Sequence, residues 1–230
     1  MKSKGKVTWG KKSRILLGQD DEQALETYVM PTDVYPQLTE SAPLPYPFDP
    51  TPKGIEVDEN KIYFFCNVGE REVLELVKTI RHLDIEMQYL SLRLSIPPVP
   101  IELHIHSGGG DIFAGLAATD AIMKCKTPIH TYVEGSVASA ATLMSIAGDK
   151  RYISKNAFML IHQLSSFMVH GKFEEFKDEM KNQESLMESI KNIYLKRTNM
   201  TKKKMEELLR HDLWLNAQEC IKLGLVDEIN

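Results

Sequence analysis

Two kinds of hydrophobic spacing alternate along the first half of the folded region. Residues 61–68 are rich in β-branched and aromatic side chains and end at a glycine, which predicts a strand, whereas residues 70–83 have apolar positions three and four apart, which predicts a helix. The segments 101–106 and 129–133 alternate as strands do, and 111–123 between them has helical spacing. Strand, helix and strand in this order predict a βαβ unit of an α/β domain.

The second half begins with two short strand-like runs, 151–154 and 157–161. A long helix is predicted from Gly171 onward, because side chains suited to a helix-packing seam recur three and four residues apart. They are Phe173, Phe176, Met180, Gln183, Met187, Ile190 and Tyr194. A helix of this length exceeds what a small core needs, so we expect it to project and to pack on another subunit.

The last predicted elements are short. Thr201 is a plausible N-cap for a helix over 202–209, and residues 216–223 predict a final helix that Gly224 closes. Residues 225–229 predict a closing strand.

Prolines set the N-terminal segment apart. Seven of the eleven prolines lie between Pro31 and Pro52, and proline both fixes φ and lacks a backbone donor. We therefore expect residues 1–57 to form an extended arm or a propeptide-like extension, and residues 58–230 to fold as one domain. The tyrosines and Phe48 of the arm offer groups for docking on a neighbouring surface; an unattached tail is the alternative.

Charge and cysteine content narrow the function classes. The formal net charge is −4, without the basic excess that is typical of nucleic-acid-binding proteins, so no nucleic-acid partner is expected. Cys66, Cys125 and Cys220 lie far apart without CxxC spacing, which favours reduced thiols and a cytoplasmic location. No apolar segment follows the basic N-terminus and no apolar run is long enough to span a bilayer, so we expect neither a secretory signal nor a membrane association.

A glycine turn follows the strand predicted at 101–106. Gly108, Gly109 and Gly110 stand between that strand and the next helix, at the end of a strand where α/β proteins bind ligands. Glycines let the backbone approach a ligand, and N–H groups at a helix start favour negative charge. This pattern indicates an anion or oxyanion site; a plain tight turn is the alternative.

A second strand end carries Ser139 among small residues. The strand over 129–133 runs into a small-residue apolar segment that ends at Gly148, an arrangement that can lift one hydroxyl above a sheet edge. We interpret Ser139 as a nucleophile, and we expect the Ala140 N–H to join one from the glycine turn in holding an oxyanion. Ser136 is the competing serine, and packing within a helix is the non-catalytic explanation for Ser139.

A third strand end carries His162. A serine hydroxyl is a poor nucleophile without an adjacent base, and histidine titrates in the useful range. A carboxylate must also orient the base, and Asp212 is our choice because it stands at a junction before the last helix. Asp111 and Asp149 are rivals for that role.

His104 and His106 point to one face of their strand and could suggest a metal pair. No third ligand follows at a sensible spacing, so we expect no metal site.

Several segments, in the same order along 60–229, resemble motifs of the proteolytic subunit of the ATP-dependent Clp protease (ClpP). The turn His106–Gly110 is similar to that family's Asn-Ser-Pro-Gly-Gly, and Gly135–Ser139 matches its Gly-x-x-Ala-Ser. Met159–Gln163 is similar to its Met-Ile-His-Gln, and Asp212–Cys220 resembles its Asp-Arg-Phe-Leu-Ser-Ala-x-Glu-Ala. The Ala-Gly pair at 114–115 and the ending at 223–227 also look like those of the family.

The resemblance implies the ClpP/crotonase-like fold, which is built from repeated ββα units with a projecting handle helix. It also implies a serine endopeptidase with the triad Ser139, His162 and Asp212, whose oxyanion is held near Gly109 or Gly110 and Ala140. Two stacked seven-membered rings and an ATP-driven unfoldase that feeds unfolded polypeptides are further implications. No Walker A motif is present, so we expect no bound nucleotide or other cofactor.

The chain departs from the family in three places. Gly108 stands where the family has proline, the segment between Ser139 and His162 is slightly shorter than usual, and the arm before residue 58 is long and proline-rich, which affects how an unfoldase docks.

Other functions are alternatives to the protease. A crotonase-type acyl-CoA enzyme would need a carboxylate near the glycine turn, and Asp111 is the close one. A non-catalytic ring subunit, or a Ser–Lys dyad with Lys150 or Lys155, are the remaining alternatives.

Overall fold

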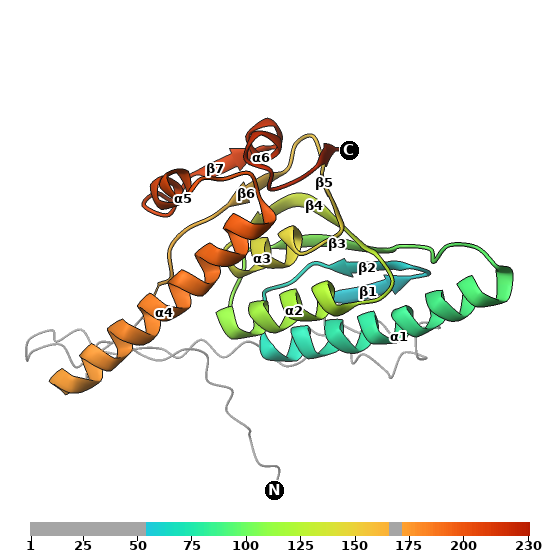
Figure 1. Cartoon of the computed structure of the whole chain (residues 1–230), viewed down its shortest axis with the longest axis horizontal. Coiled ribbons are helices and arrows are strands. Elements are labelled where there is room, and N and C mark those ends of the chain that lie inside the picture. Colours follow the sequence, from blue (N-terminus) through green and yellow to red (C-terminus); the bar gives the residue numbers. More distant parts are fainter. Residues whose placement is uncertain (1–53, 166–171) are drawn as a thin grey trace, which may run out of the picture. The chain divides into compact units, whose positions relative to one another are not determined.

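A mixed β-sheet organises the chain in this computed structural model, which describes residues 54–165 and 172–230 (Figure 1). Within these ranges the strands are β1 (Ile55–Asp58), β2 (Lys61–Phe64), β3 (Ile101–Ser107), β4 (Ile129–Ala138), β5 (Lys150–Ile153), β6 (Phe158–Leu160), β7 (Trp214–Asn216) and β8 (Glu228–Ile229). The helices are α1 (Glu70–Leu94), α2 (Ile112–Lys124), α3 (Ala140–Ile146), α4 (Phe173–Arg197), α5 (Lys202–Leu208) and α6 (Ala217–Leu223). This architecture confirms the predicted α/β class.

The long strand β4 holds the sheet together. The strand order is β1-β2-β3-β4-β5-β8, and every neighbouring pair on this path is parallel except β1 with β2. The first half of β4 pairs with β5, and its second half pairs with β6, which in turn pairs antiparallel with β7. The end of β4, where Ser139 follows, therefore lies beside the end of β6.

Alternation along the strands separates a core face from an outer face. In β3, Ile101, Leu103 and Ile105 are buried, and in α1 the residues Val73 and Leu76 are among those that pack into the same core. This follows from the two-residue period of a strand, which sends every second side chain to one face. α1 and α2 lie next to each other against the sheet (Figure 1).

Two predicted elements differ in extent from those observed. At the start of the described sheet, Ile55 is buried and pairs with Phe64, three residues before the proposed boundary between arm and domain at residue 58. The arm itself, residues 1–53, lies outside the described residues. α1 continues past 83 to Leu94, although its final turns bury few side chains, and it stops just before Pro97 and Pro98. The closing strand covers only Glu228–Ile229, because the Leu225 N–H donates to the Cys220 carbonyl at 2.9 Å and so belongs to the end of α6.

β7 is an element that the sequence did not predict. It has three residues, of which Leu215 is buried and Trp214 and Asn216 are exposed. Its antiparallel partner is β6, whose pairing with it sets Leu160 opposite Trp214. The segment that contains Asp212 consequently enters a strand rather than joining one helix to the next.

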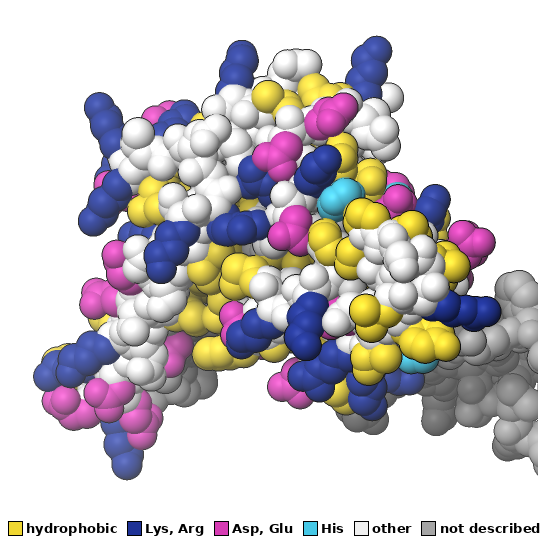
Figure 2. Space-filling model, turned by 45° about the vertical axis from the view of Figure 1, so that its right-hand side comes forward, with side chains coloured by type: hydrophobic (Ala, Val, Ile, Leu, Met, Phe, Trp, Pro, Cys, Tyr) yellow, Lys and Arg dark blue, Asp and Glu magenta, His cyan; other side chains and the backbone are white. Residues whose placement is uncertain are grey.

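The long helix α4 confirms the prediction of a projecting element. Of its 25 residues, Ile190 and Tyr194 are the buried ones, whereas Phe173 is 72% and Met180 64% exposed. Figure 1 shows its N-terminal part leading away from the sheet, and Figure 2 shows charged side chains at this tip and hydrophobic ones in the hollow beside it. No helix in the described ranges combines the length and hydrophobicity that crossing a membrane requires.

Candidate active site

Ser139 occupies a strained turn between β4 and α3. Its φ of 55° and ψ of −131° lie in a region that residues with a side chain rarely adopt. Such a conformation costs about 1–3 kcal/mol and is found most often at functional sites. A sharp strand-to-helix turn of this kind presents a side chain at the top of a sheet, as the nucleophile turns of other hydrolases do.

A cavity of about 220 Å³ brings Ser139 and His162 together. Gly110 and Ala140 line the same cavity, so the glycine turn and the start of α3 both face it. The remaining wall is mostly apolar and includes Ile112, Leu143, Leu164, Ile190 and Tyr194. Four of the six residues selected from the sequence therefore contribute to one small, mostly apolar space.

Asp212 does not line this cavity, and its side chain is exposed. The β6–β7 ladder nevertheless leads towards it, because Leu160 pairs with Trp214 and His162 and Asp212 each lie two residues further on. The ladder ends at Leu160 and Trp214; continued for two more residues in the same antiparallel register, it would set His162 opposite Asp212 on the same side of the pair. In the described residues no hydrogen bond joins the Ser139 hydroxyl, the His162 ring and the Asp212 carboxylate; such contacts are often long before substrate binds.

The two glycines of the turn have different roles. The Gly109 N–H donates to Ser107 Oγ at 3.2 Å, and the Gly109 carbonyl accepts from the Val68 N–H at 2.8 Å. The N–H of Gly110 has no hydrogen-bond partner within the described ranges, and Gly110 lines the cavity. Ala140 is the first residue of α3, so its N–H is one that the helix leaves unpaired. Gly110 and Ala140 thus supply two free donors on one cavity wall.

Gly109 contributes through its lack of a side chain. A Cβ atom on this residue would lie 2.6 Å from the Ser139 Cβ and 2.7 Å from the Ala138 carbonyl oxygen, and its φ is +91°. Only glycine permits this close approach between the turn and the serine.

The rival carboxylates have other partners. Asp111 lines the cavity, but it is the N-cap of α2, where one of its carboxylate oxygens accepts the Ala114 N–H at 2.7 Å. Asp149 accepts the N–H of Ile129, the first residue of β4, at 2.8 Å, whereas Ser139 follows the last residue of that strand. At about 3.3 Å per residue, this strand separates the two by roughly 30 Å.

The rival nucleophile and the rival lysine bases lie apart from the cavity. Ser136 is inside β4, where its N–H donates to His106 Nδ1 at 3.2 Å, and it does not line the cavity. Lys150 pairs with His130 near the far end of β4, and Lys155 is exposed and likewise absent from the cavity wall.

The histidines that suggested a metal pair lie on the outer face of the sheet. His104 Nδ1 is 2.6 Å from a Glu134 carboxylate oxygen, and its ring stacks between Tyr63 and Tyr132. In the part of the chain that the structure describes, no three His, Cys, Asp or Glu side chains are grouped to hold a metal ion.

Comparisons with known proteins agree with this architecture. The Clp protease family model matches residues 74–230. The proteolytic subunit 1 of the ATP-dependent Clp protease from Chlamydia muridarum is 27% identical over 176 residues, covering 75% of this chain and 87% of its own. Subunit 2 from Treponema denticola is 36% identical over 132 residues, covering 56% of this chain and 66% of its own.

A solved structure resembles the fold as well. A mutant of ClpP1 from Listeria monocytogenes superposes with a TM-score of 0.61 at 24% sequence identity, covering 72% of this chain and 87% of that one. At this identity the likeness speaks for the fold, whereas the family match spans the candidate site from the glycine turn to the last strand. The chain belongs to the Clp protease family.

Proposed function

We propose that Ser139, His162 and Asp212 are the catalytic triad of this serine endopeptidase. Membership of the Clp protease family makes the chain a serine peptidase. The observation that carries the assignment of residues is the strained Ser139, which faces a cavity shared with His162. The register of β6 and β7 supports Asp212 as the carboxylate.

In the proposed reaction, Ser139 Oγ attacks the carbonyl carbon of the scissile peptide while His162 takes the hydroxyl proton. The N–H groups of Gly110 and Ala140 donate to the oxyanion of the tetrahedral intermediate, and each such donor is typically worth about 3–4 kcal/mol of transition-state stabilisation. His162 then returns the proton to the leaving amine, and water hydrolyses the acyl-enzyme by the same route. Asp212 orients the imidazole and stabilises its charged form.

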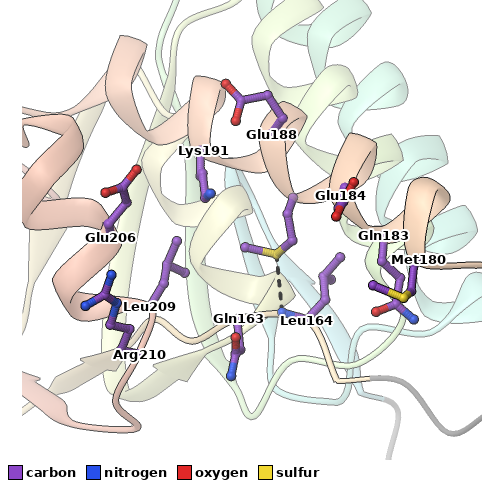
Figure 3. Close-up of a pocket in the computed structure, with 11 residues that line it drawn as sticks. Gln163, Leu164, Met180, Gln183, Glu184, Glu188, Lys191, Glu206, Leu209 and Arg210 are labelled. Carbon is purple, nitrogen blue, oxygen red and sulfur yellow. Dashed lines mark hydrogen bonds between the residues drawn. The ribbon is translucent and has the colours of Figure 1, made fainter.

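The surroundings of the cavity support an extended polypeptide as substrate. Gln163 and Leu164 line both the Ser139 cavity and a groove of about 700 Å³ that runs between α4 and α5. Figure 3 shows Leu164 beneath α4, where its N–H donates to the Met187 sulfur at 3.3 Å. A second groove of about 510 Å³, which residues of α2 and α4 line, also includes Leu164. An unfolded chain of several residues fits these three spaces, which share Leu164, better than a small compact ligand does.

We further propose the assembly that the family resemblance implies: two stacked seven-membered rings enclosing the sites, fed by an ATP-driven unfoldase. The exposed apolar side chains of α4 support contact with another subunit. The three cysteines, none of them in a disulfide, support a reducing compartment such as the cytoplasm. Residues before the first strand are proposed as an N-terminal extension.

A fluorophosphonate probe tests the nucleophile. We expect wild-type protein and Ser136→Ala to be labelled and Ser139→Ala to lose labelling, with circular dichroism unchanged in both variants. Labelling that survives in Ser139→Ala and disappears in Ser136→Ala would move the nucleophile to Ser136.

A further inference from the structure

The main chain of Ser139 is held from both sides. Its N–H donates to the Leu160 carbonyl at 2.9 Å, which ties it to the strand that leads to His162. Its carbonyl accepts the Thr142 N–H at 3.0 Å and the Thr142 hydroxyl at 2.5 Å. The strained turn therefore depends on Thr142 for both hydrogen bonds to its carbonyl.

The Thr142 hydroxyl is in turn hydrogen-bonded to the hydroxyl of Tyr194. Thr142 Oγ1 forms a short hydrogen bond with the Tyr194 hydroxyl, and both side chains are buried. A carbonyl oxygen can only accept, so Thr142 donates its proton to Ser139 and its oxygen accepts from Tyr194. Burial raises the pKa of the Tyr194 hydroxyl well above its ordinary value, so this group remains a donor. The direction of the whole chain of hydrogen bonds is thereby fixed.

Tyr194 belongs to α4, which forms hydrogen bonds with both ends of the short helix α3. At the N-terminal end of α3, Tyr194 contacts Thr142; at the C-terminal end, the Arg197 guanidinium donates to the carbonyls of Ile146 and Ala147, each at 2.9 Å. The nucleophile turn is thus fastened to an element more than fifty residues away in the sequence.

We propose that Thr142 and Tyr194 are positioning residues for the nucleophile. Their relayed hydrogen bonds hold the Ser139 carbonyl, and with it the serine side chain and the Ala140 N–H, in the geometry needed for attack. Neither hydroxyl touches the reacting atoms. Without them the strained turn relaxes and the hydroxyl leaves its place, while the cavity that binds the substrate keeps its shape. This role rests on the proposed function of Ser139.

Fluorophosphonate inactivation of the full-length protein tests this role, because its kinetics give two separate quantities. The limiting rate constant of inactivation reports the attack by Ser139, and the half-saturating probe concentration reports binding of the probe in the cavity. Thr142→Val keeps the shape of the side chain without its hydroxyl, and we expect a limiting rate constant about tenfold lower with the half-saturating concentration within about twofold of wild type. Thr142→Ser retains the hydroxyl and should stay within about threefold. Tyr194→Phe should lower the rate constant, and adding it to Thr142→Val should cause little further loss, because both changes break one relay.

Thr131→Val is the matched control. Thr131 in β4 is buried and donates its hydroxyl to the carbonyl of Ser145 in α3 at 2.7 Å, so this substitution removes a similar buried hydroxyl–carbonyl hydrogen bond away from Ser139. We expect thermal unfolding of this variant to shift as for Thr142→Val while its inactivation rate matches wild type.

The outcomes distinguish the two claims. Wild-type protein that is never labelled would overturn the proposed function and the positioning role with it. If wild-type protein is labelled, three results would overturn the positioning role alone. They are an unchanged limiting rate constant in Thr142→Val and Tyr194→Phe, an equal loss of this rate constant in Thr131→Val, and an effect that is confined to the half-saturating concentration.

Discussion

At the scale of single residues, neighbouring glycines of one turn face different constraints. An added Cβ on Gly109 would collide with Ser139 and Ala138, whereas on Gly108 its nearest neighbour would be the Asn67 side-chain oxygen at 4.0 Å. The φ of Gly109 also lies in the region that side chains disfavour. Gly109 therefore fixes the distance between the glycine turn and Ser139, while Gly108 leaves room for a larger residue.

Replacing these glycines separates the two constraints. We expect Gly109→Ala to lower kcat/KM for a peptide substrate by about 100-fold or more, because misplacing a catalytic group by about 1 Å has costs of this size. Gly108→Ala, which meets open space, should keep activity within about threefold. A Gly109→Ala enzyme as active as Gly108→Ala in a fluorogenic peptidase assay would contradict this view of the turn.

The sequence pattern selected Ser139 and His162, and the structure places both residues on the wall of one cavity. The sequence could not separate Gly109 from Gly110 as a donor, because that choice depends on Ser107, whose hydroxyl oxygen accepts the Gly109 N–H. The relay through Thr142 and Tyr194 was equally hidden, since it joins residues that are remote in the chain. Tyr194 carried only the signal of a helix-packing position.

At the scale of elements, capping signals made some segment ends predictable and short strands did not. Thr201 caps α5 as predicted, whereas Asp111, which was predicted as the first residue of its helix, is the N-cap of α2. β7 was missed because three residues are too few to show a period, and its partner β6 is equally short. The pairing that leads His162 towards Asp212 is therefore a result of tertiary structure.

This pairing predicts the effect of removing the Asp212 charge. Asp212→Asn should lower kcat by about 10³–10⁴-fold with little change in KM, because the imidazole loses its orienting carboxylate. Asp149→Asn, at the far end of β4, is the matched control and should keep kcat within about twofold. If steady-state peptidase kinetics showed the larger loss of kcat in Asp149→Asn, the carboxylate that orients His162 would be Asp149, and our assignment of Asp212 would be wrong.

A second element-scale prediction concerns acid stability. Arg151 in β5 donates to the Asp227 carboxylate from its backbone N–H at 2.9 Å and from Nε at 3.0 Å. Partial burial alone would raise the pKa of Asp227, but the hydrogen bonds and charge of Arg151 outweigh it and hold this pKa below its usual value. The resulting stability is present above the unfolded pKa of about 3.9 and is lost as pH falls through the lower folded pKa.

We therefore expect Asp227→Asn to lower the free energy of unfolding by about 1 kcal/mol at pH 7, a value reduced for solvent screening, with the difference from wild type vanishing near pH 2. Urea unfolding at both pH values measures it. Asp120→Asn, which breaks only an exposed pair with Lys124, should cost no more than about 0.5 kcal/mol. If the difference in the free energy of unfolding between wild type and Asp227→Asn grew as pH fell, the result would contradict a lowered pKa of Asp227 in the folded protein.

At the scale of the whole molecule, the helix α4 connects the Ser139 turn to a surface of exposed apolar side chains. Its C-terminal turns bury Ile190 and Tyr194 against the body, and its N-terminal turns expose Phe173, Phe176 and Met180. The hydrophobic spacing predicted the helix and its projection, because the seam was too long for one small core. The hydrophobic spacing does not show which surface packs on the exposed end of α4, because that surface belongs to another subunit in the proposed assembly.

Assembly should depend on this exposed seam. We expect Phe176→Ser to shift the protein from a large oligomer towards smaller species in analytical ultracentrifugation, because it removes apolar area of the proposed subunit contact. Lys181→Ser, on an exposed charged position of the same helix, should leave the oligomer intact. Equal sedimentation of the two variants would argue against a subunit contact through this seam.

The most direct test of the triad is a crystal structure of the protein after reaction with a fluorophosphonate. Our account predicts a bond from phosphorus to Ser139 Oγ, a phosphoryl oxygen within hydrogen-bond distance of the Gly110 and Ala140 N–H groups, and the His162 ring between Ser139 and Asp212. An adduct on another residue, or a His162 ring that is oriented by a carboxylate other than Asp212, would contradict it.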